Sequence, residues 1–308
     1  MRTSARYTLG IDLGGTTTSL AVVDARNYVV EEQSFPTRAE AGFDDVLRRM
    51  CEAAAAALER YPCVAVGVAA AAQVDAEAGT LVASPNLRFA NEPLAARLRD
   101  ALGLPVILEN DVNAAAYGEY LAEAEAREPL LAVFVGTGIG GGLVAGGEVF
   151  RGADGFAAEI GHVPVVPAGG EPCGCGRRGC VEAYAGGSAI VRRANTRRPP
   201  EAPAFADVDG VAAAAAAGDA GSRAILEEAA DYLGVALAAA VNLLNPGTLV
   251  VGGGVARAWP PLVPRALDRM KESALPPALA SLATREALFG TWAGAIGAAA
   301  LARKSVKP

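Results

Sequence analysis

The sequence is poor in several groups on which binding sites are commonly built. It has one histidine, two tryptophans and an aromatic share of 6%. Basic residues do not outnumber acidic ones: the net charge is -7 and the isoelectric point is near 5.0. A nucleic-acid-binding face is expected to be basic, so we predict no nucleic-acid partner. No Gly-Lys pair occurs, which excludes a P-loop.

Long apolar runs are missing as well. No stretch of about eighteen apolar residues lacks a charge or a cluster of glycines, so we expect no membrane span. The two N-terminal arginines are not followed by an apolar run, and we therefore expect no signal peptide. Five cysteines without a secretory signal are expected to be reduced thiols, which predicts a cytoplasmic protein.

What the chain does contain is a long series of α/β signals. At 308 residues and 52% apolar content it is long enough for two domains. Apolar patterning predicts strands over residues 7–12, 19–24, 28–33, 64–69, 106–108, 130–135, 142–145 and 248–251. Helical spacing predicts helices over 43–60, 92–102, 112–126, 212–217, 224–244 and 292–303, with an exposed connector over 195–206.

A hairpin that carries glycine and threonine occurs twice, about 124 residues apart (136 minus 12), each time at the start of a strand-then-helix series. A weak internal duplication of this kind predicts two similar α/β domains around a cleft. We place the first domain at residues 1–117, completed by a C-terminal helix over 292–308. The second domain is placed at residues 118–291 and contains the adenosine site.

Three of the five cysteines, Cys173, Cys175 and Cys180, lie within eight residues, and Cys173 follows His162 by eleven. Three thiolates and one imidazole form the ligand set of a closed, tetrahedral zinc site. A disulfide is the alternative, but Cys173 and Cys175 are too close for easy bridging and nothing indicates secretion. The pattern therefore favours structural Zn²⁺.

The two glycine-rich loops offer bare backbone amides and hydroxyls that can surround phosphate oxygens. A strand follows each loop, so neither matches a dinucleotide-binding fingerprint, and each alone is also consistent with a tight turn. Together with the glycines at 252–254 they predict ATP binding, with Asp12 holding Mg²⁺. The residues assigned to the nucleotide are Asp12, Gly14, Gly15, Thr16, Thr17, Gly136, Thr137, Gly138, Gly253 and Gly254.

Asp111 stands where the strand over 106–108 hands over to a helix. In open α/β sheets ligands bind at the carboxyl ends of strands. Asp111 is consistent with a helix N-cap, but beside nucleotide loops an aspartate can also accept the proton of a hydroxyl that attacks a γ-phosphate. Asn110 beside it offers a donor and an acceptor suited to sugar hydroxyls.

These motifs together resemble the ROK sugar kinases, most of all the bacterial glucokinases, over essentially the full length. The resemblance is carried by the first glycine loop, Pro85-Asn86-Leu87, Glu109-Asn110-Asp111, the loop over 136–141, Glu159-Ile160-Gly161-His162, the cysteine loop with Glu182, and Asn245-Pro246-Gly247 leading into the glycines at 252–254.

The resemblance implies an actin-like ATPase (ribonuclease H-like) fold and transfer of the ATP γ-phosphoryl group to a hexose, glucose by preference, at the 6-hydroxyl. It implies that Asp111 is the catalytic base and that Asn86, Asn110, Glu159, His162 and Glu182 bind the sugar. It also implies structural zinc on His162, Cys173, Cys175 and Cys180, with the other nitrogen of His162 facing the sugar. A homo-oligomer, dimer or tetramer, is expected.

The sequence departs from the family pattern at three alanines. Ala71 and Ala72 stand where Pro-Gly is common, and Ala158 stands where glycine often precedes the glutamate. The sugar could therefore be another hexose, namely N-acetylmannosamine, fructose or mannose. Two other classes are weighed against the kinase: a sugar-responsive regulator of the same family, and a filament-forming or chaperone-type ATPase that would not need the cysteine loop.

Overall fold

The computed structural model describes residues 7–84, 87–122 and 126–306, and it is an α/β protein as predicted. The chain divides into two compact units, Met1–Glu125 with Gly142–Ala157 and Leu288–Pro308, and Ala126–Gly141 with Ala158–Ala287. Our division into domains at residue 117 stays a prediction, and the first unit additionally takes in residues 142–157.

The first unit is built on a five-stranded mixed sheet. Its order is β3-β2-β1-β4-β8, with antiparallel pairs β1–β2 and β2–β3 and parallel pairs β1–β4 and β4–β8. The strands are β1 (Tyr7–Leu13), β2 (Thr17–Val23), β3 (Val29–Pro36), β4 (Cys63–Ala70) and β8 (Val106–Asn110). A smaller antiparallel sheet holds β5 (Gln73–Asp75), β6 (Thr80–Ser84) and β7 (Phe89–Glu92), which the sequence patterns did not predict.

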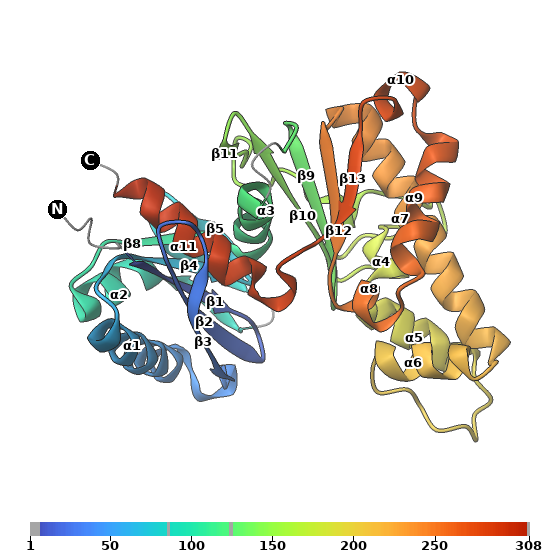
Figure 1. Ribbon diagram of the computed structural model, residues 1–308. Coiled ribbons are helices and arrows are strands. Elements are labelled where there is room, and N and C mark those ends of the chain that lie inside the picture. Colours follow the sequence, from blue (N-terminus) through green and yellow to red (C-terminus); the bar gives the residue numbers. More distant parts are fainter. Residues whose placement is uncertain (1–6, 85–86, 123–125, 307–308) are drawn as a thin grey trace. The chain divides into compact units, whose positions relative to one another are not determined.

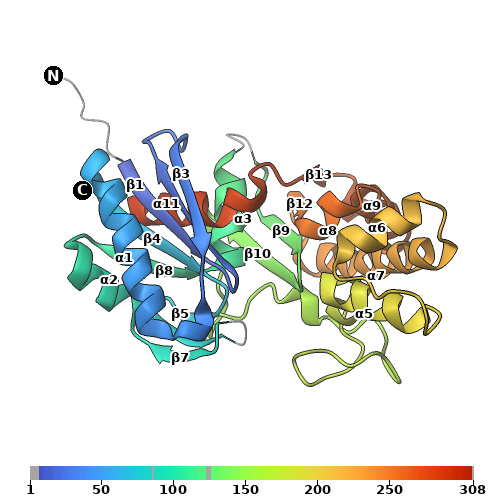
Figure 2. The same ribbon diagram turned by 90° about the horizontal axis from the view of Figure 1, so that it is seen from below.

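Helices cover both faces of the larger sheet (Figures 1 and 2). On one face lie α1 (Phe43–Arg60) and α2 (Leu94–Leu102), and on the other α3 (Asp111–Ala122) and α11 (Ala293–Ser305). The backbone of α11 approaches the sheet so closely that a Cβ atom on Gly10 would lie 1.8 Å from the Ala295 carbonyl oxygen. A Cβ on Gly67 would lie 1.9 Å from that of Ala298. Only glycine allows so close an approach. As a result, the beginning of α11 lies beside the end of β1.

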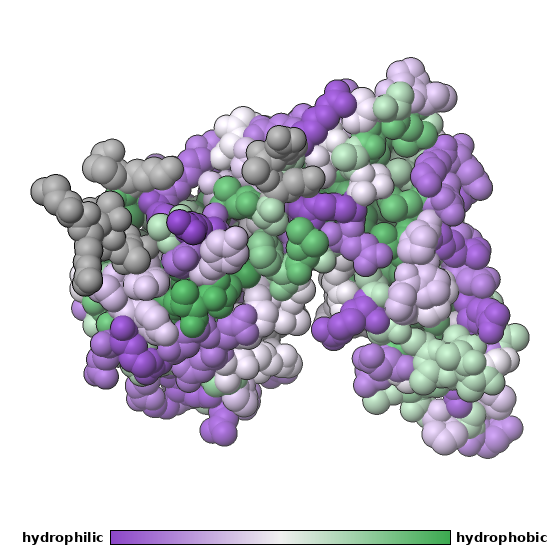
Figure 3. Space-filling model, in the orientation of Figure 1, coloured by the Kyte–Doolittle hydropathy of each residue, from purple (hydrophilic) through white to green (hydrophobic). Residues whose placement is uncertain are grey.

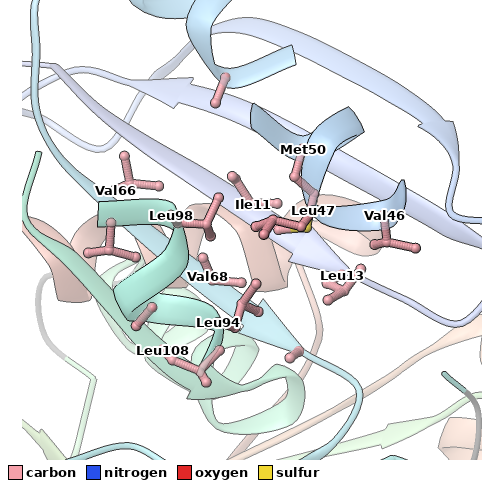
Figure 4. Close-up of a cluster of buried hydrophobic side chains, with 14 of the residues drawn as sticks. Ile11, Leu13, Val46, Leu47, Met50, Val66, Val68, Leu94, Leu98 and Leu108 are labelled. Carbon is pink, nitrogen blue, oxygen red and sulfur yellow. The ribbon is translucent and has the colours of Figure 1, made fainter. Parts of the chain in front are cut away.

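The core of the first unit lies between the sheet and helices α1 and α2 (Figure 4). Its side chains come from alternate positions of the strands and from one face of each helix, as the apolar spacing predicts. The labelled members are Ile11, Leu13, Val46, Leu47, Met50, Val66, Val68, Leu94, Leu98 and Leu108. Burial of each such side chain contributes roughly 1.5–3 kcal/mol. The region of α1 is mainly hydrophilic on its outer side in Figure 3, where its exposed residues include Asp44, Arg48 and Glu52.

The second sheet has the order β11-β10-β9-β12-β13, and its strands are β9 (Leu130–Val135), β10 (Ile139–Ala145), β11 (Glu148–Val149), β12 (Thr248–Gly252) and β13 (Ala283–Glu286). The pairs β9–β12 and β12–β13 are parallel, and β10–β11 is antiparallel. The helices of the second unit are α4 (Glu182–Ala185), α5 (Gly187–Arg197), α6 (Val208–Ala216), α7 (Ala220–Leu244), α8 (Gly254–Ala258), α9 (Leu262–Ser273) and α10 (Pro276–Leu279).

The two sheets repeat one pattern of strand order. In each, the third, second, first, fourth and fifth strands follow one another across the sheet, which matches the duplication expected from the repeated hairpin. Three short 3₁₀ helices, η1 (Ala39–Ala41), η2 (Ile160–His162) and η3 (Gly290–Trp292), complete the described elements. No helix in the described part of the chain has the length and apolar character required to span a membrane.

The predicted connector over 195–206 begins too early, since α5 continues to Arg197. The helix α9 was not predicted at all. Pro264 reads as a helix breaker in the sequence, but it stands in the first turn of α9, where a missing backbone N–H costs nothing.

Candidate active site

The first glycine loop connects β1 to β2 and is held by a threonine from outside the loop. The Gly14 amide donates to the Thr17 carbonyl at 3.1 Å. The Thr37 hydroxyl, which is fully buried, donates to the Gly14 carbonyl at 2.7 Å and lies 2.9 Å from the Thr18 hydroxyl. Gly14 and Gly15 are half-buried, whereas Thr16 and Thr17 are exposed. The loop is therefore rigid at its base and accessible at its tip.

Asp12 lies just before this loop and close to the start of α11. A Cβ atom on Gly294 would lie 2.6 Å from Asp12 Oδ2. Desolvation and the negative charge of Asp111 raise the pKa of Asp12 from 3.8 to about 7. A carboxylate that is costly to ionise, beside a second carboxylate, is a suitable place for a cation, because the cation stabilises the charged form. Asp12 could thus hold Mg²⁺.

Asp111 is the first residue of α3 and follows directly on β8. Its Oδ1 atom accepts from Asn110 Nδ2 at 3.0 Å and from the Val112 amide at 3.0 Å. The capping acceptor of α3 is Asn110 Oδ1, which receives the amides of Val112 and Asn113 at 3.0 and 3.1 Å. The side chain of Asn110, and not that of Asp111, is therefore the main N-cap of α3, and it holds the turn that contains Asp111.

Asn110 has protein partners at both ends of its amide. Besides Asp111, its Nδ2 atom donates to the Ala72 carbonyl at 3.2 Å. Its assignment as a sugar ligand stays a prediction, and Asn86 lies outside the described residues. Both Asn110 and Asp111 belong to the first unit, with Asp12.

The second glycine loop connects β9 to β10. The Gly136 amide donates to the Gly138 carbonyl at 2.9 Å, and the Gly187 and Ser188 amides at the start of α5 donate to the carbonyls of Gly136 and Thr137. Gly253, at φ +107°, packs against the Val135 backbone. Because Gly252 pairs with Phe134 in parallel strands, Gly253 and Gly254 lie at the same end of the sheet as the loop. The two predicted nucleotide segments of this unit are therefore neighbours.

Glu182, the first residue of α4, ties this loop to the cysteine segment. Its Oε2 atom accepts from the Ile139 amide at 2.8 Å, and its Oε1 atom lies 3.7 Å from Cys173 Sγ. A Cβ atom at position 138 would lie 2.3 Å from Glu182 Oε2, so Gly138 leaves the room that this carboxylate occupies. Glu182 was predicted as a sugar ligand, and its link to the loop was not predicted.

The four predicted zinc ligands come together, with their ligand atoms all within 4.8 Å of one another. His162 Nδ1 lies 3.7 Å from Cys173 Sγ, and Cys175 Sγ lies 3.8 Å from Cys180 Sγ. Zinc–sulfur bonds of ~2.3 Å in a tetrahedron separate two sulfurs by about 3.8 Å. The residues therefore fit a tetrahedral metal.

The thiols of this cluster also have the electrostatics of a metal site. Burial raises the pKa of Cys173 to about 12 and raises the pKa of Cys180. A backbone hydrogen bond at Arg177 lowers the pKa of Cys175. Two neutral thiols beside a more acidic one can all bind as thiolates only when a cation offsets their charge, as Zn²⁺ does.

The loop that carries the cysteines is short and tightly turned. The Cys173 amide donates to the Arg177 carbonyl at 2.8 Å, and the Gly176 amide to the Cys173 carbonyl at 3.0 Å. Gly179 has φ +81°, and a Cβ atom there would lie 2.0 Å from the Val166 carbonyl oxygen, so no other residue fits. The Tyr184 hydroxyl accepts a hydrogen bond from the Glu171 amide at 2.7 Å and so ties the segment before the cysteines to α4.

With Nδ1 directed to the cysteines, His162 turns its other nitrogen toward Glu159. Its Nε2 atom lies 3.9 Å from Glu159 Oε2. Partial burial and the charge of Glu182 raise the pKa of Glu159, while His162 acts in the opposite direction. Glu159, His162 and Glu182 thus form one group in the second unit, beside the cysteine cluster.

Several residues that hold these groups were not identified from the sequence. Thr37 and Arg151 are single polar residues with no motif around them, and Asn113 stands two positions after the motif Glu109-Asn110-Asp111. Each acts through a partner between 4 and 42 positions away in the chain. A buried threonine at the end of β3 and an arginine in a glycine-rich segment acquire a role only once the strands are paired.

Paired glycine loops at the carboxyl ends of strands, with carboxylates beside them, are typical of α/β phosphotransferases that use a nucleotide. The chain belongs to the ROK family, whose sequence profile matches residues 8–305.

Individual relatives agree with this assignment. The glucokinase of Halalkalibacterium halodurans is 33% identical over 96% of this chain and 94% of its own length. A ROK glucokinase from Streptomyces griseus, solved with glucose and AMPPNP, has a TM-score of 0.82 and 32% identity, covering 97% of this chain and 99% of that one. The ROK hexokinase of Thermus thermophilus has a TM-score of 0.84 and 34% identity with the same coverage.

Proposed function

We propose that this chain phosphorylates a hexose with ATP, most readily glucose, and that it transfers the γ-phosphoryl group to the 6-hydroxyl. It is a sugar kinase of the ROK family, with the actin-like ATPase fold. The observation that carries the proposal is the position of Asp111 at the carboxyl end of β8, where Asn110 donates a hydrogen bond to its Oδ1 atom. The negative charge of Asp111 contributes to the raised pKa of Asp12. A fixed carboxylate beside a cation site is what proton removal from a sugar hydroxyl requires.

The residues divide the chemistry between them. Asp111 accepts the proton of the attacking hydroxyl, which contributes ~10²–10⁴-fold to the rate. Asp12 holds Mg²⁺, which neutralises charge on the phosphates. The glycine loops present backbone amides to the nucleotide, and Glu159, His162 and Glu182 accept or donate hydrogen bonds to sugar hydroxyls, together with Asn110 and Asn86.

Zinc, in this proposal, is structural. His162, Cys173, Cys175 and Cys180 would hold the metal, and the bond to Nδ1 would fix the imidazole ring of His162 so that Nε2 keeps one direction. The metal takes no part in phosphoryl transfer. One Zn²⁺ per chain is expected by elemental analysis, and Cys175→Ser should lose it, whereas Cys63→Ser should keep it because Cys63 is not part of the cluster.

An ADP-release assay with a panel of hexoses tests the function. Glucose should stimulate ATP turnover above mannose, fructose and N-acetylmannosamine, and ³¹P NMR should place the phosphate on the 6-oxygen. Sugar binding without ATP turnover would instead support the regulator. ATP turnover that no sugar stimulates would support the filament or chaperone class. A cytoplasmic location and a dimer or tetramer complete the proposal, and sedimentation measurements test the assembly.

A further inference from the structure

One carboxylate beside the predicted base is buried and is not used by the proposed reaction. Glu109 is the penultimate residue of β8, and its side chain is 1% exposed. A charge in such a place is costly unless it is paired and fully hydrogen-bonded. The hydrogen-bond partners of Glu109 therefore indicate its structural role.

Both oxygens of Glu109 are occupied. Oε1 accepts from the Asn110 amide at 2.9 Å and from Asn113 Nδ2 at 3.2 Å. Oε2 accepts from Arg151 Nε at 2.8 Å and also from Arg151 Nη2. One oxygen thus holds the first turn of α3, and the other holds a guanidinium that arrives from a separate segment, 42 positions later in the chain.

The hydrogen bonds continue from Glu109 to Asp111. Asn113, which Glu109 holds by its side chain, donates its backbone amide to Asn110 Oδ1 at 3.1 Å. Asn110 in turn donates from Nδ2 to Asp111 Oδ1 at 3.0 Å. Asn110 and the Val112 amide therefore hold Asp111 Oδ1, and Glu109 holds the backbone amide of Asn110.

We propose that Glu109 and Arg151 form a positioning pair for Asp111. Arg151 orients Glu109 by its two hydrogen bonds to Oε2, and Glu109 holds the Asn110–Asn113 turn, so that Asp111 points in one direction. Neither residue touches the sugar or the nucleotide. This inference rests on the proposed role of Asp111 as the base.

The guanidinium is suited to this task by its geometry. Its Nε and Nη2 atoms both donate to Glu109 Oε2, a two-donor contact that the single ammonium nitrogen of a lysine cannot reproduce. The Arg151 side chain is 42% exposed and lines a pocket of about 340 Å³. A small cation from solution can therefore reach the place that the guanidinium leaves in a truncated variant.

Kinetics of Arg151→Ala and Arg151→Lys test the proposal. Arg151→Ala should lower kcat about 10- to 100-fold with glucose, because a small displacement of a catalytic group has an effect of this size. KM for ATP should remain within a factor of about 2, since the glycine loops are not held by this pair. Millimolar guanidinium should restore kcat in Arg151→Ala, and Arg151→Lys should remain impaired.

The control is Arg97→Ala. Arg97 is also a half-exposed arginine of the first unit, 47% exposed, and it pairs with the exposed Asp44 at 3.0 Å. Its replacement should leave kcat unchanged, with or without guanidinium. A normal kcat in Arg151→Ala would overturn the proposal, and so would a loss that guanidinium does not repair.

Hydrogen exchange keeps this inference separate from the proposed function. If wild-type protein turns over no ATP with any hexose, the proposed function fails. The exchange rate of the Asn113 amide still tests whether Glu109 and Arg151 hold the turn. Faster exchange of this amide in Arg151→Ala than in Arg97→Ala is the expected result. Equal exchange in the two variants would show that the pair does not hold the turn.

Discussion

The two glycine loops stand at equivalent places in two sheets of the same strand order, yet they are held by different chemistry. The first loop is fixed by the neutral hydroxyl of Thr37. The second is fixed by the carboxylate of Glu182, which lies 3.7 Å from a sulfur of the metal cluster. The shared strand order thus determines where each glycine loop lies. Residues outside the repeated hairpin, Thr37 in one unit and Glu182 in the other, determine which side chain holds the loop.

The division between the units predicts that substitutions in the first and in the second unit have different kinetic effects. The proposed proton acceptor, Asp111, belongs to the first unit, and Glu159, His162 and Glu182, beside the cysteine cluster, belong to the second. Five substitutions test these roles and the local geometry of the site, taken from the largest expected effect to the smallest.

Asp111→Asn should have the largest effect. An amide cannot accept the proton, so kcat should fall by ~10²–10⁴-fold. The asparagine has the same shape, and its Oδ1 atom can still accept from Asn110 Nδ2 and the Val112 amide, so thermal unfolding should be unchanged. Asp100→Asn, on the exposed face of α2, is the matched control and should keep full activity. Turnover close to wild type in Asp111→Asn would refute the assignment of the base.

Thr37→Val removes the hydrogen bond that holds the first glycine loop, and Glu182→Ala removes the one that holds the second. The effects of the two variants on KM can then be compared. Loss of one hydrogen bond costs about 0.5–1.5 kcal/mol, or roughly 2- to 10-fold in affinity. Thr37→Val should raise only KM for ATP by such a factor. Glu182→Ala should raise KM for both ATP and glucose, because the carboxylate serves the loop and the sugar group. Equal effects on ATP alone in both variants would remove Glu182 from the sugar site.

Asp12→Asn should stabilise the ligand-free protein, and it should raise the Mg²⁺ concentration needed for turnover. The folded-state pKa of about 7 is above the ordinary 3.8, so the folded state binds more protons between these values. Wild-type stability from this group is complete below pH 3.8 and is lost as pH rises through about 7.

The asparagine variant should therefore exceed wild type by ~1–3 kcal/mol at pH 8 and by much less at pH 4. Chemical unfolding at both pH values in the absence of nucleotide measures this difference. A gain that does not change between pH 4 and pH 8 would contradict the shifted pKa.

Ala158→Gly should have the smallest effect, and it tests a departure from the family pattern. Ala158 has φ +62°, a left-handed conformation that costs an alanine ~1–2 kcal/mol. Glycine should raise the free energy of unfolding by ~0.5–1 kcal/mol after its greater freedom in the unfolded chain is subtracted. The control Ala157→Gly, at a residue without positive φ, should destabilise instead. Loss of stability in both variants would show that position 158 is not strained.

The sequence predicts the parts of this protein that repeat or that carry rare residue types. The cysteine cluster could be predicted because three thiols and the only histidine are close in the chain. The repeated hairpin predicted two similar α/β domains, and the two sheets indeed share one pattern of strand order. The supports of the site could not be predicted, because Thr37 and Arg151 meet Gly14 and Glu109 only after strands distant in sequence pair. The helix α9 was missed because a proline within it reads as a breaker until its position in the first turn is known.

The role of the metal cluster can be isolated by calorimetric titration of glucose into Asp111→Asn before and after zinc removal. No ATP is present and this variant is impaired in turnover, so the titration reports sugar binding alone. Zinc-loaded protein should bind glucose as wild type does, and zinc-stripped protein should lose at least about tenfold in affinity because His162 is no longer fixed. Equal affinity of the two forms would contradict the claim that the cysteine cluster holds the sugar-binding group in place.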